Sequence, residues 1–166
     1  MDMSIRKATA DDFKTIWPIF RDIISAGETY PYASTTTREQ GEQIWMNSPM
    51  ATYLAEHQGK TLGTYYIKPN QPNRGAHICN CGYMIAREAR NQGLATALCK
   101  HSQDVAVKNG FLAMQFNLVV STNFTAVHLW QKLGFSIIGT IPKAFNHARS
   151  GLVDAHIMYK QLNPDS

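Results

Sequence analysis

Apolar residues recur every three or four positions between Thr9 and Ala26, and this spacing predicts an amphipathic helix that Thr9 or Asp11 can cap. A second helix is expected over residues 37–47, because Pro49 cannot continue it. Further along the chain, short alternating or strongly apolar segments predict strands. Strands are expected at residues 4–8, 52–57, 61–69, 77–85, 113–120, 136–141 and 153–161, helices at 93–109 and 123–133, and an exposed loop at 142–151.

The order of these elements predicts a mixed α/β fold. The strand, helix and strand between residues 77 and 120 form a crossover unit, whose two strands we expect to be parallel with a right-handed connection. Parallel strands need cover on both faces, so helices should flank the sheet. The chain has 166 residues and shows no internal repeat or long linker, so we expect one domain over residues 1–166.

Composition indicates a globular protein, since 44% of the residues are hydrophobic and 17% are charged. No segment is apolar enough to span a bilayer, and the first residues, MDMSIRKATADD, lack the basic-then-apolar pattern of a signal peptide. Three cysteines, Cys79, Cys81 and Cys99, cannot all pair, which disfavours a disulfide framework. We therefore expect a cytoplasmic protein with no membrane partner.

The net charge of +4 permits an anionic partner. Because the lysines and arginines are scattered, the sequence favours a phosphate-rich cofactor over nucleic acid, and no nucleic-acid partner is expected. His77, Cys79 and Cys81 would share one face of a strand, where successive residues lie about 7 Å apart. Three such side chains cannot meet at one tetrahedral zinc, so we also expect no metal.

The segment from Ile85 to Ala95 carries the clearest chemical pattern: a strand ends, a polar loop follows, and a helix begins at Gly93. The first amides of a helix have no partner within it and lie at its positive end, which makes an anion site. Arg90 adds a full positive charge. This pattern favours a cradle for a diphosphate. The alternative is an ordinary strand-to-helix turn in which Gly93 permits close packing.

Two motifs resemble those of a known family. The segment RNQGLA (residues 90–95) is similar to the acyl-CoA diphosphate motif of the GNAT superfamily of N-acetyltransferases, and NFTAVHLWQKLGF (residues 123–135) resembles a second segment of that superfamily. The resemblance covers nearly the whole chain and implies a GNAT-like fold: a mixed, mostly antiparallel central sheet with one parallel, splayed strand pair, flanked by helices. It also implies an acyltransferase that uses acetyl-CoA as cosubstrate.

By this resemblance, the pantetheine arm of acetyl-CoA inserts between the strand ending at Ile85 and the strand starting at Ala113. The cofactor-binding residues so implied are Tyr83, Met84, Ile85, Arg90, Asn91, Gln92, Gly93, Leu94, Ala95, Thr96 and Asn123. Asn123 has an alternative role as a helix N-cap, a position that asparagine favours. Trp130 replaces a tyrosine that many members use to protonate the departing thiolate, and an indole cannot supply that acid.

Asn80 and Asn117 lie inside two strands that should be central, although asparagine is disfavoured in strands. A buried amide without partners costs about 1–3 kcal/mol, so each is either a structural amide bonded to neighbouring backbone or a contact for the substrate. The segments HICNCGY (residues 77–83) and FNLVVSTN (residues 116–123) resemble acetyltransferases that detoxify the proline analogue azetidine-2-carboxylate. This resemblance implies that both asparagines bind the substrate and assist catalysis.

The loop after the first helix contains Glu28 and Tyr30 and falls where small-substrate members of the superfamily place acceptor contacts, including enzymes for phosphinothricin-like amino acids. We therefore expect the acceptor to be a small-molecule amine, an amino acid or a toxic analogue of one. Acetylation of protein N-termini or lysines, and a non-enzymatic coenzyme A-binding module, are the open alternatives. Superfamily members often dimerise, so a homodimer is compatible with the resemblance.

Overall fold

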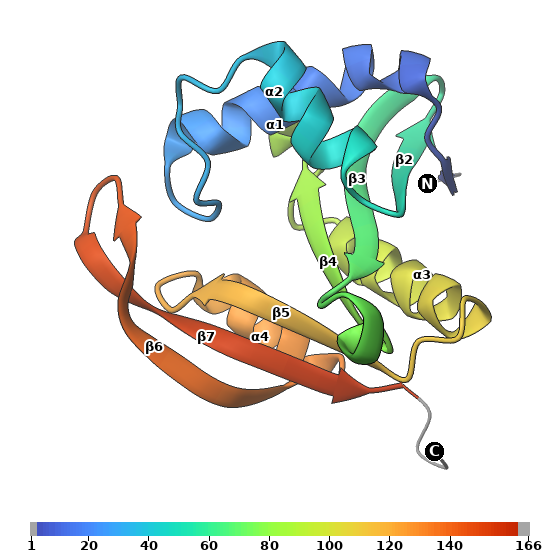
Figure 1. Cartoon of the computed structure of the whole chain (residues 1–166). Coiled ribbons are helices and arrows are strands. Elements are labelled where there is room, and N and C mark those ends of the chain that lie inside the picture. Colours follow the sequence, from blue (N-terminus) through green and yellow to red (C-terminus); the bar gives the residue numbers. More distant parts are fainter. Residues whose placement is uncertain (1–2, 163–166) are drawn as a thin grey trace.

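The computed structural model describes residues 3–162, so residues 1–2 and 163–166 of the expected domain lie outside the described part. The elements follow the order predicted from the sequence (Figure 1). They are β1 (Ser4–Lys7), α1 (Phe13–Ala26), α2 (Arg38–Glu42), β2 (Ala51–His57), β3 (Lys60–Pro69), β4 (Ile78–Ile85), α3 (Leu94–Lys108), β5 (Ala113–Val120), α4 (Phe124–Lys132), β6 (Ser136–His147) and β7 (Gly151–Gln161). Short helical turns are η1 (Ala10–Asp12), η2 (Gln43–Asn47), η3 (Asn73–Gly75) and η4 (Arg87–Ala89). Within residues 3–162, no helix is long and apolar enough to cross a membrane.

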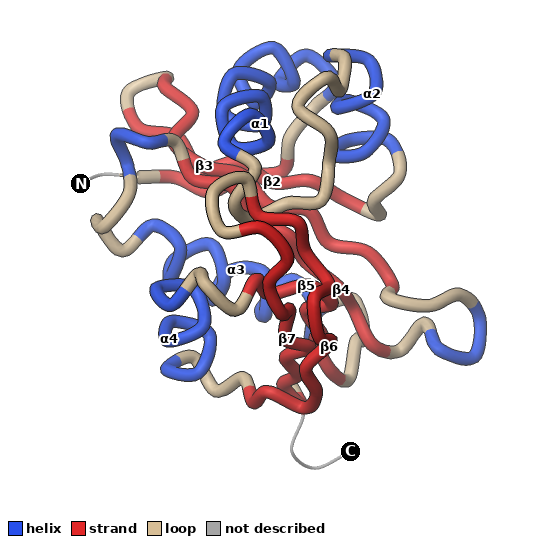
Figure 2. Tube along the Cα trace, turned by 90° about the vertical axis from the view of Figure 1, so that its left-hand side faces the viewer, coloured by secondary structure: helices blue, strands red, loops and turns tan. Residues whose placement is uncertain are grey.

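One seven-stranded sheet organises the molecule, with the strand order β1-β2-β3-β4-β5-β7-β6. In the described part of the chain, β4 and β5 are the only neighbours that run parallel. α1 and α2 lie against one face of the sheet, and α3 and α4 lie against the other (Figures 1 and 2). The prediction of a mixed, mostly antiparallel sheet with one parallel pair and flanking helices is therefore confirmed.

β4 and β5 pair only at their first residues, Ile78 with Ala113 and Cys79 with Met114. Beyond these pairs the two strands diverge (Figure 1), while β4 stays paired with β3 and β5 with β7. We call the place where they separate the fork. The sheet is thus held together at one end of the parallel pair and open at the other, as the splayed pair expected from the sequence requires.

Aromatic packing fixes the α1 side of the molecule against β3. The ring of Trp45, which is fully buried, meets Phe20 of α1 edge-on at 5.8 Å and Tyr66 of β3 at 4.8 Å between centroids. Its indole N–H donates to Thr64 Oγ1 at 3.1 Å. α1 continues through Pro18. Tyr30, in the loop that follows the helix, meets the same indole edge-on at 5.8 Å and donates a hydrogen bond to the Tyr83 carbonyl, which holds this loop close to the fork.

The prediction of an exposed loop at residues 142–151 is wrong. β6 and β7 both extend into this region, and residues 148–150 alone form the turn between them. A bulge between Ile141 and Phe145 interrupts the pairing and contains Pro142. Proline is tolerated in an edge strand that need not donate a ladder hydrogen bond. The polar, proline-containing sequence resembled a loop because β6 lies at the exposed edge of the sheet.

Candidate active site

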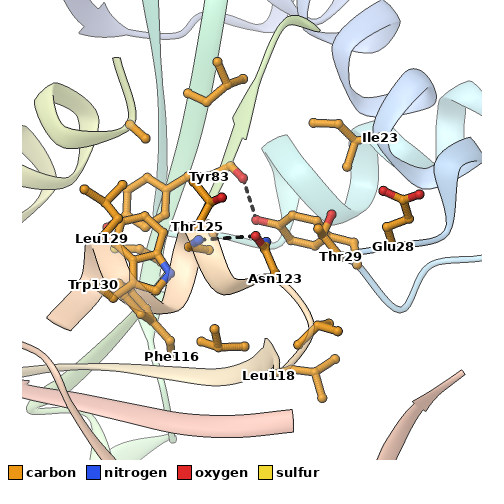
Figure 3. A pocket seen from close by; sticks show the side chains of 18 of the residues that line it. Ile23, Glu28, Thr29, Tyr83, Phe116, Leu118, Asn123, Thr125, Leu129 and Trp130 are labelled. Atoms are coloured by element: carbon orange, nitrogen blue, oxygen red, sulfur yellow. Dashed lines mark hydrogen bonds between the residues drawn. The ribbon is translucent and has the colours of Figure 1, made fainter. Parts of the chain in front are cut away.

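A cavity of about 1000 Å³ lies at the fork. It is bounded by β4, β5, the start of α3, α4 and the loop after α1. Figure 3 shows labelled side chains from these elements around it, namely Glu28, Thr29, Tyr83, Phe116, Leu118, Asn123, Leu129 and Trp130. The cavity therefore connects the helix start predicted to bind a diphosphate with the strands and the loop predicted to bind the acceptor.

Backbone groups of β4 face the fork at alternate residues. The carbonyl of Ile78 accepts a hydrogen bond from Asn70 N at 2.8 Å, so the even-numbered residues of β4 bond to the β3 side. Because an antiparallel ladder alternates, Cys81 and Tyr83 direct their N–H and C=O groups toward the fork. The Tyr30 hydroxyl confirms this direction, since it donates to the Tyr83 carbonyl at 2.8 Å (Figure 3).

The predicted anion site has free amides and open space. Gly93 precedes α3 with φ 78°, and no side chain caps the helix. The first intrahelical bond runs from Ala97 N to Gly93 O at 3.1 Å, which leaves the amides of residues 94–96 without helical partners. A Cβ added to Gly93 would meet no atom within 4 Å. Close packing therefore does not explain this glycine, whereas a left-handed turn that a ligand can approach does.

Asn80 is buried at the fork, and both ends of its amide are bonded. Oδ1 accepts from the Tyr66 hydroxyl at 3.0 Å, and Nδ2 donates to the Gln115 carbonyl at 2.9 Å. Since β4 and β5 stop pairing one residue earlier, this side chain bridges β3 and β5 where the backbone bonds end. Asn80 therefore has the structural role that the sequence left open, as an amide bonded to its neighbours. Asn80 also lines the cavity, and its contact with a substrate stays a prediction.

Asn117 was expected to be buried, and it is exposed. The pairing of β5 with β7 shifts between Phe116 and Val119, so Asn117 lies in a bulge and has no paired residue on β7. Its Nδ2 donates to Asn70 Oδ1 at 2.7 Å, and its Oδ1 accepts from Gln115 Nε2 at 3.0 Å. The side chain lines the cavity, so a substrate contact stays a prediction that no longer rests on burial.

The loop after α1 closes the cavity on the side away from α4. Glu28 lines the cavity, and its carboxylate pairs with Arg149 Nε in the β6–β7 turn at 3.1 Å. Burial raises the pKa of Tyr30 well above its ordinary value of 10.0, so its hydroxyl is a neutral hydrogen-bond donor. Both residues predicted for the acceptor loop therefore reach the same cavity as the fork.

Burial disfavours the thiolate form of two cysteines near the fork. Cys79, Cys81 and Cys99 are free and buried. Burial raises the pKa of Cys81 well above its ordinary value of 9.0 and raises the pKa of Cys99 as well. A nucleophilic cysteine needs a lowered pKa. Cys81 and Cys99 therefore offer no site for a covalent acyl-enzyme.

Comparison with known proteins identifies the family. The sequence profile of the Acetyltransferase (GNAT) family matches residues 15–135, which include both strands of the fork and the start of α3. The chain belongs to the GNAT family of acetyltransferases. An N-acetyltransferase of Schizosaccharomyces pombe, aca1, is 33% identical over 151 residues, which cover 81% of this chain and 72% of the relative. The chain is accordingly an N-acetyltransferase, a member of the acyltransferases.

Two solved GNAT structures resemble this chain closely in fold. A GCN5-related N-acetyltransferase from Kribbella flavida superposes with a TM-score of 0.90 at 44% identity, covering 96% of this chain and 97% of that one. A phosphinothricin acetyltransferase from Sinorhizobium meliloti, solved in complex with acetyl-CoA, superposes with a TM-score of 0.86 at 18% identity, covering 98% and 90%. At that low identity, the second comparison shows a shared fold.

Trp130 fills the position where many GNAT members have a tyrosine. Its ring lies 5.1 Å from that of Tyr83 and 5.1 Å from that of Phe116, and it lines the cavity (Figure 3). An indole offers one N–H donor and no acidic hydroxyl. In this GNAT chain the position therefore supplies a packing surface between β4 and β5 rather than an acid.

Asn123 is the N-cap of α4, which is the alternative role predicted from the sequence. Its Oδ1 accepts from Ala126 N at 3.2 Å (Figure 3). This bond satisfies one of the free amides at the start of the helix. The side chain also lines the cavity, and its amide nitrogen can still donate to a ligand. The cofactor contact implied by the GNAT motif stays a prediction.

The cavity collects most of the residues that the GNAT resemblance implied: Glu28, Tyr30, Asn80, Tyr83, Ile85, Arg90, Asn91, Gly93, Leu94, Ala95, Thr96, Asn117 and Asn123. Met84 and Gln92 do not line it. Met84 is buried in the core, and Gln92 Nε2 donates to the carbonyl of Glu88 at 2.8 Å.

Sequence reasoning missed several polar residues of the cavity, among them Tyr66 and Lys68 of β3 and Lys132 of α4. Alternation along β3 places Tyr66 and Lys68 on one face. Their position beside the fork depends on the register of β3 with β4, which pairs Lys68 with Asn80. That register cannot be read from either strand alone.

Proposed function

We propose that this chain transfers the acetyl group of acetyl-CoA to the amine of a small molecule in the cytoplasm, and that the acceptor is an amino acid or a toxic analogue such as azetidine-2-carboxylate. The continuity of the cavity carries this proposal. One space reaches from the free amides at the start of α3 to the polar side chains at the fork. A long nucleotide thioester and a small acceptor can meet there.

The residues present fit the diphosphate and the pantetheine arm of acetyl-CoA. The amides of residues 94–96 and the side chain of Arg90 offer donors and positive charge, and the open space over Gly93 admits a ligand. Lys132 lines the same cavity and adds a cation. Along β4, the backbone of Tyr83 can bond the amides of the arm as an added strand would.

Acetyl-CoA supplies an activated carbonyl group and a thiolate that leaves readily. The nitrogen of the neutral acceptor amine donates its lone pair to form the new C–N bond and then loses a proton to water, while the C–S bond breaks and its electron pair stays on sulfur. The N–H groups of Cys81 and Tyr83 point into the fork, where they can donate to the carbonyl oxygen as it gains negative charge. Holding both reactants in one cavity supplies further acceleration.

The acceptor side is formed by Asn80, Asn117, Tyr30 and Glu28. We assign the two asparagines and Tyr30 to binding and orienting the acceptor, since their polar groups border the fork. Glu28 accepts the amine proton through a water molecule, because an ammonium group must lose a proton before it can attack. Trp130 takes no part in proton transfer.

A thiol-release assay with acetyl-CoA tests this proposal. The acceptors are azetidine-2-carboxylate, proline, phosphinothricin, the common amino acids, and a peptide with a free N-terminus and a lysine. We expect release with at least one free amino acid or analogue and a background rate with the peptide. Release with the peptide alone, or with none of these amines, contradicts the proposal. The Gly93→Asp variant is the inactive control.

A further inference from the structure

Lys68 stands at the acceptor side of the fork. It is half-buried, lines the cavity, and lies directly opposite Asn80 in the β3–β4 register. Its Nζ lies over the ring of Tyr66, 5.3 Å from the centroid. Tyr66 is buried and bonded to Asn80. The ammonium group is therefore held over a fixed aromatic surface, next to the amide that bridges the fork.

Charge in the cavity is strongly one-sided. The charged residues of its lining are Glu28, Lys68, Arg90 and Lys132. The single acid among them, Glu28, is paired with Arg149. Within residues 3–162, the ion pairs involve Arg6, Lys60 and Arg149 as the cations, and Lys68 takes part in none of them. The cavity thus keeps positive charge at both of its ends.

The cofactor end and the acceptor end of the cavity should bind different anions. Arg90 adjoins the start of α3, and Lys132 ends α4, so both belong to the part of the cavity assigned to the cofactor. Leu94, at the start of α3, packs on Gly63 of β3, and Lys68 lies five residues further along the same strand, roughly 16 Å away. A cation at the acceptor end has no phosphate of the cofactor to meet, and its natural partner is an anionic group on the acceptor.

We propose that Lys68 binds the carboxylate of the acceptor, so that the substrate class is α-amino or cyclic imino acids rather than simple amines, polyamines or peptides. This inference rests on the proposed function and deepens it. In an α-amino acid the carboxylate and the amine share one carbon, so both enter the fork together. A peptide N-terminus presents a neutral amide in place of that carboxylate, and a polyamine presents only like charge.

Matched acceptor pairs test the role of Lys68. Azetidine-2-carboxylate and proline are each compared with their carboxamides, by thiol release and by calorimetric binding to the coenzyme A complex. We expect wild-type protein to prefer the carboxylates. Lys68→Met should lower kcat/KM for the carboxylates by about ten- to a hundredfold and leave the carboxamides nearly unchanged. Lys68→Arg should retain most of the preference. Lys14→Met, on the exposed face of α1, is the matched control and should behave as wild type.

Different outcomes test the role of Lys68 and the proposed acetyltransferase function. Turnover without preference for the carboxylates, or a preference that survives Lys68→Met, overturns the role of Lys68 and leaves the acetyltransferase proposal intact. Absence of turnover with every amine overturns the proposed function. Calorimetry then decides on Lys68 by itself: carboxylate binding that Lys68→Met abolishes supports the inference, and binding that is absent or unaffected overturns it.

Discussion

At the scale of single residues, the two asparagines of the fork hold different parts of the structure. Asn80 is 5% exposed and joins the Tyr66 hydroxyl to the Gln115 carbonyl. Asn117 is exposed and bonds to two other side chains. Removing the Asn80 amide leaves buried polar groups without hydrogen-bond partners. Removing the Asn117 amide leaves its partners free to bond to water instead.

Alanine substitutions should separate structure from catalysis at these two positions. Asn80→Ala should lower the free energy of unfolding by about 1–3 kcal/mol, because two buried groups lose their partner, and should lower kcat as well. Asn117→Ala should change stability by less than about 0.5 kcal/mol and still lower kcat/KM severalfold. Thermal denaturation and steady-state kinetics measure both effects. Wild-type rates in both variants would reject their role in the reaction.

Gly93 tests the anion site. Gly93→Asp should abolish coenzyme A binding, since it places a negative charge where the free amides point. Gly93→Asn has the same bulk without the charge and should bind more tightly than Gly93→Asp. Gly59→Asp is the matched control, because Gly59 has φ 74° and equally open surroundings in the β2–β3 turn. Calorimetry that finds equal affinity in wild type and Gly93→Asp would rule out the cradle.

At the scale of elements, the β6–β7 turn holds the loop after α1 in place. Ala148 N donates to Gly27 O at 2.9 Å, and Arg149 pairs with Glu28. A Cβ on Gly27 would lie 3.0 Å from the Cβ of Ala148, and Gly27 has φ 64°. The glycine therefore permits both the turn after α1 and the close approach of the hairpin. Through this contact the edge of the sheet shapes the acceptor side of the cavity.

Breaking the ion pair between Glu28 and Arg149 should increase the mobility of the loop after α1 more than it lowers the stability of the fold. The Arg149 side chain is 83% exposed, so Arg149→Ala should cost no more than about 0.5 kcal/mol. We expect faster hydrogen exchange across residues 27–37 and a severalfold higher KM for the acceptor. Lys60→Ala removes another exposed ion pair, with Glu88 at 2.7 Å, and should change neither quantity. Equal loop exchange in wild type and Arg149→Ala would contradict this account.

Asp12 joins β1 to the start of α1, and its effect should depend on pH. Hydrogen bonds from Arg6, at 2.8 and 2.9 Å, hold the pKa of Asp12 well below its ordinary 3.8, although burial partly opposes the shift. A lowered folded-state pKa gives stabilisation that is complete above the unfolded value and is lost as the pH falls. Asp12→Asn should therefore lower Tm at pH 7, and the difference should narrow below about pH 4. A difference that is constant from pH 7 to pH 2 would reject this role.

At the scale of the whole molecule, features carried by consecutive residues could be predicted from the sequence. The order of helices and strands, the parallel pair and the open turn at Gly93 all depend on local patterns. The structure has the predicted order and parallel pair, and it has an open turn at Gly93. Features that depend on pairing could not be predicted. The exposure of Asn117 follows from a bulge, Lys68 reaches the fork through strand register, and Arg149 reaches Glu28 because the β6–β7 hairpin is longer than its polar sequence suggests.

The most direct test of the account is a crystal structure of the protein with coenzyme A and azetidine-2-carboxylate. We expect the diphosphate on the amides of residues 94–96 and the pantetheine arm beside Tyr83 in the fork. The amino-acid carboxylate should lie at Lys68. A nucleotide bound elsewhere, or a fork closed by protein side chains in the complex, would contradict the account.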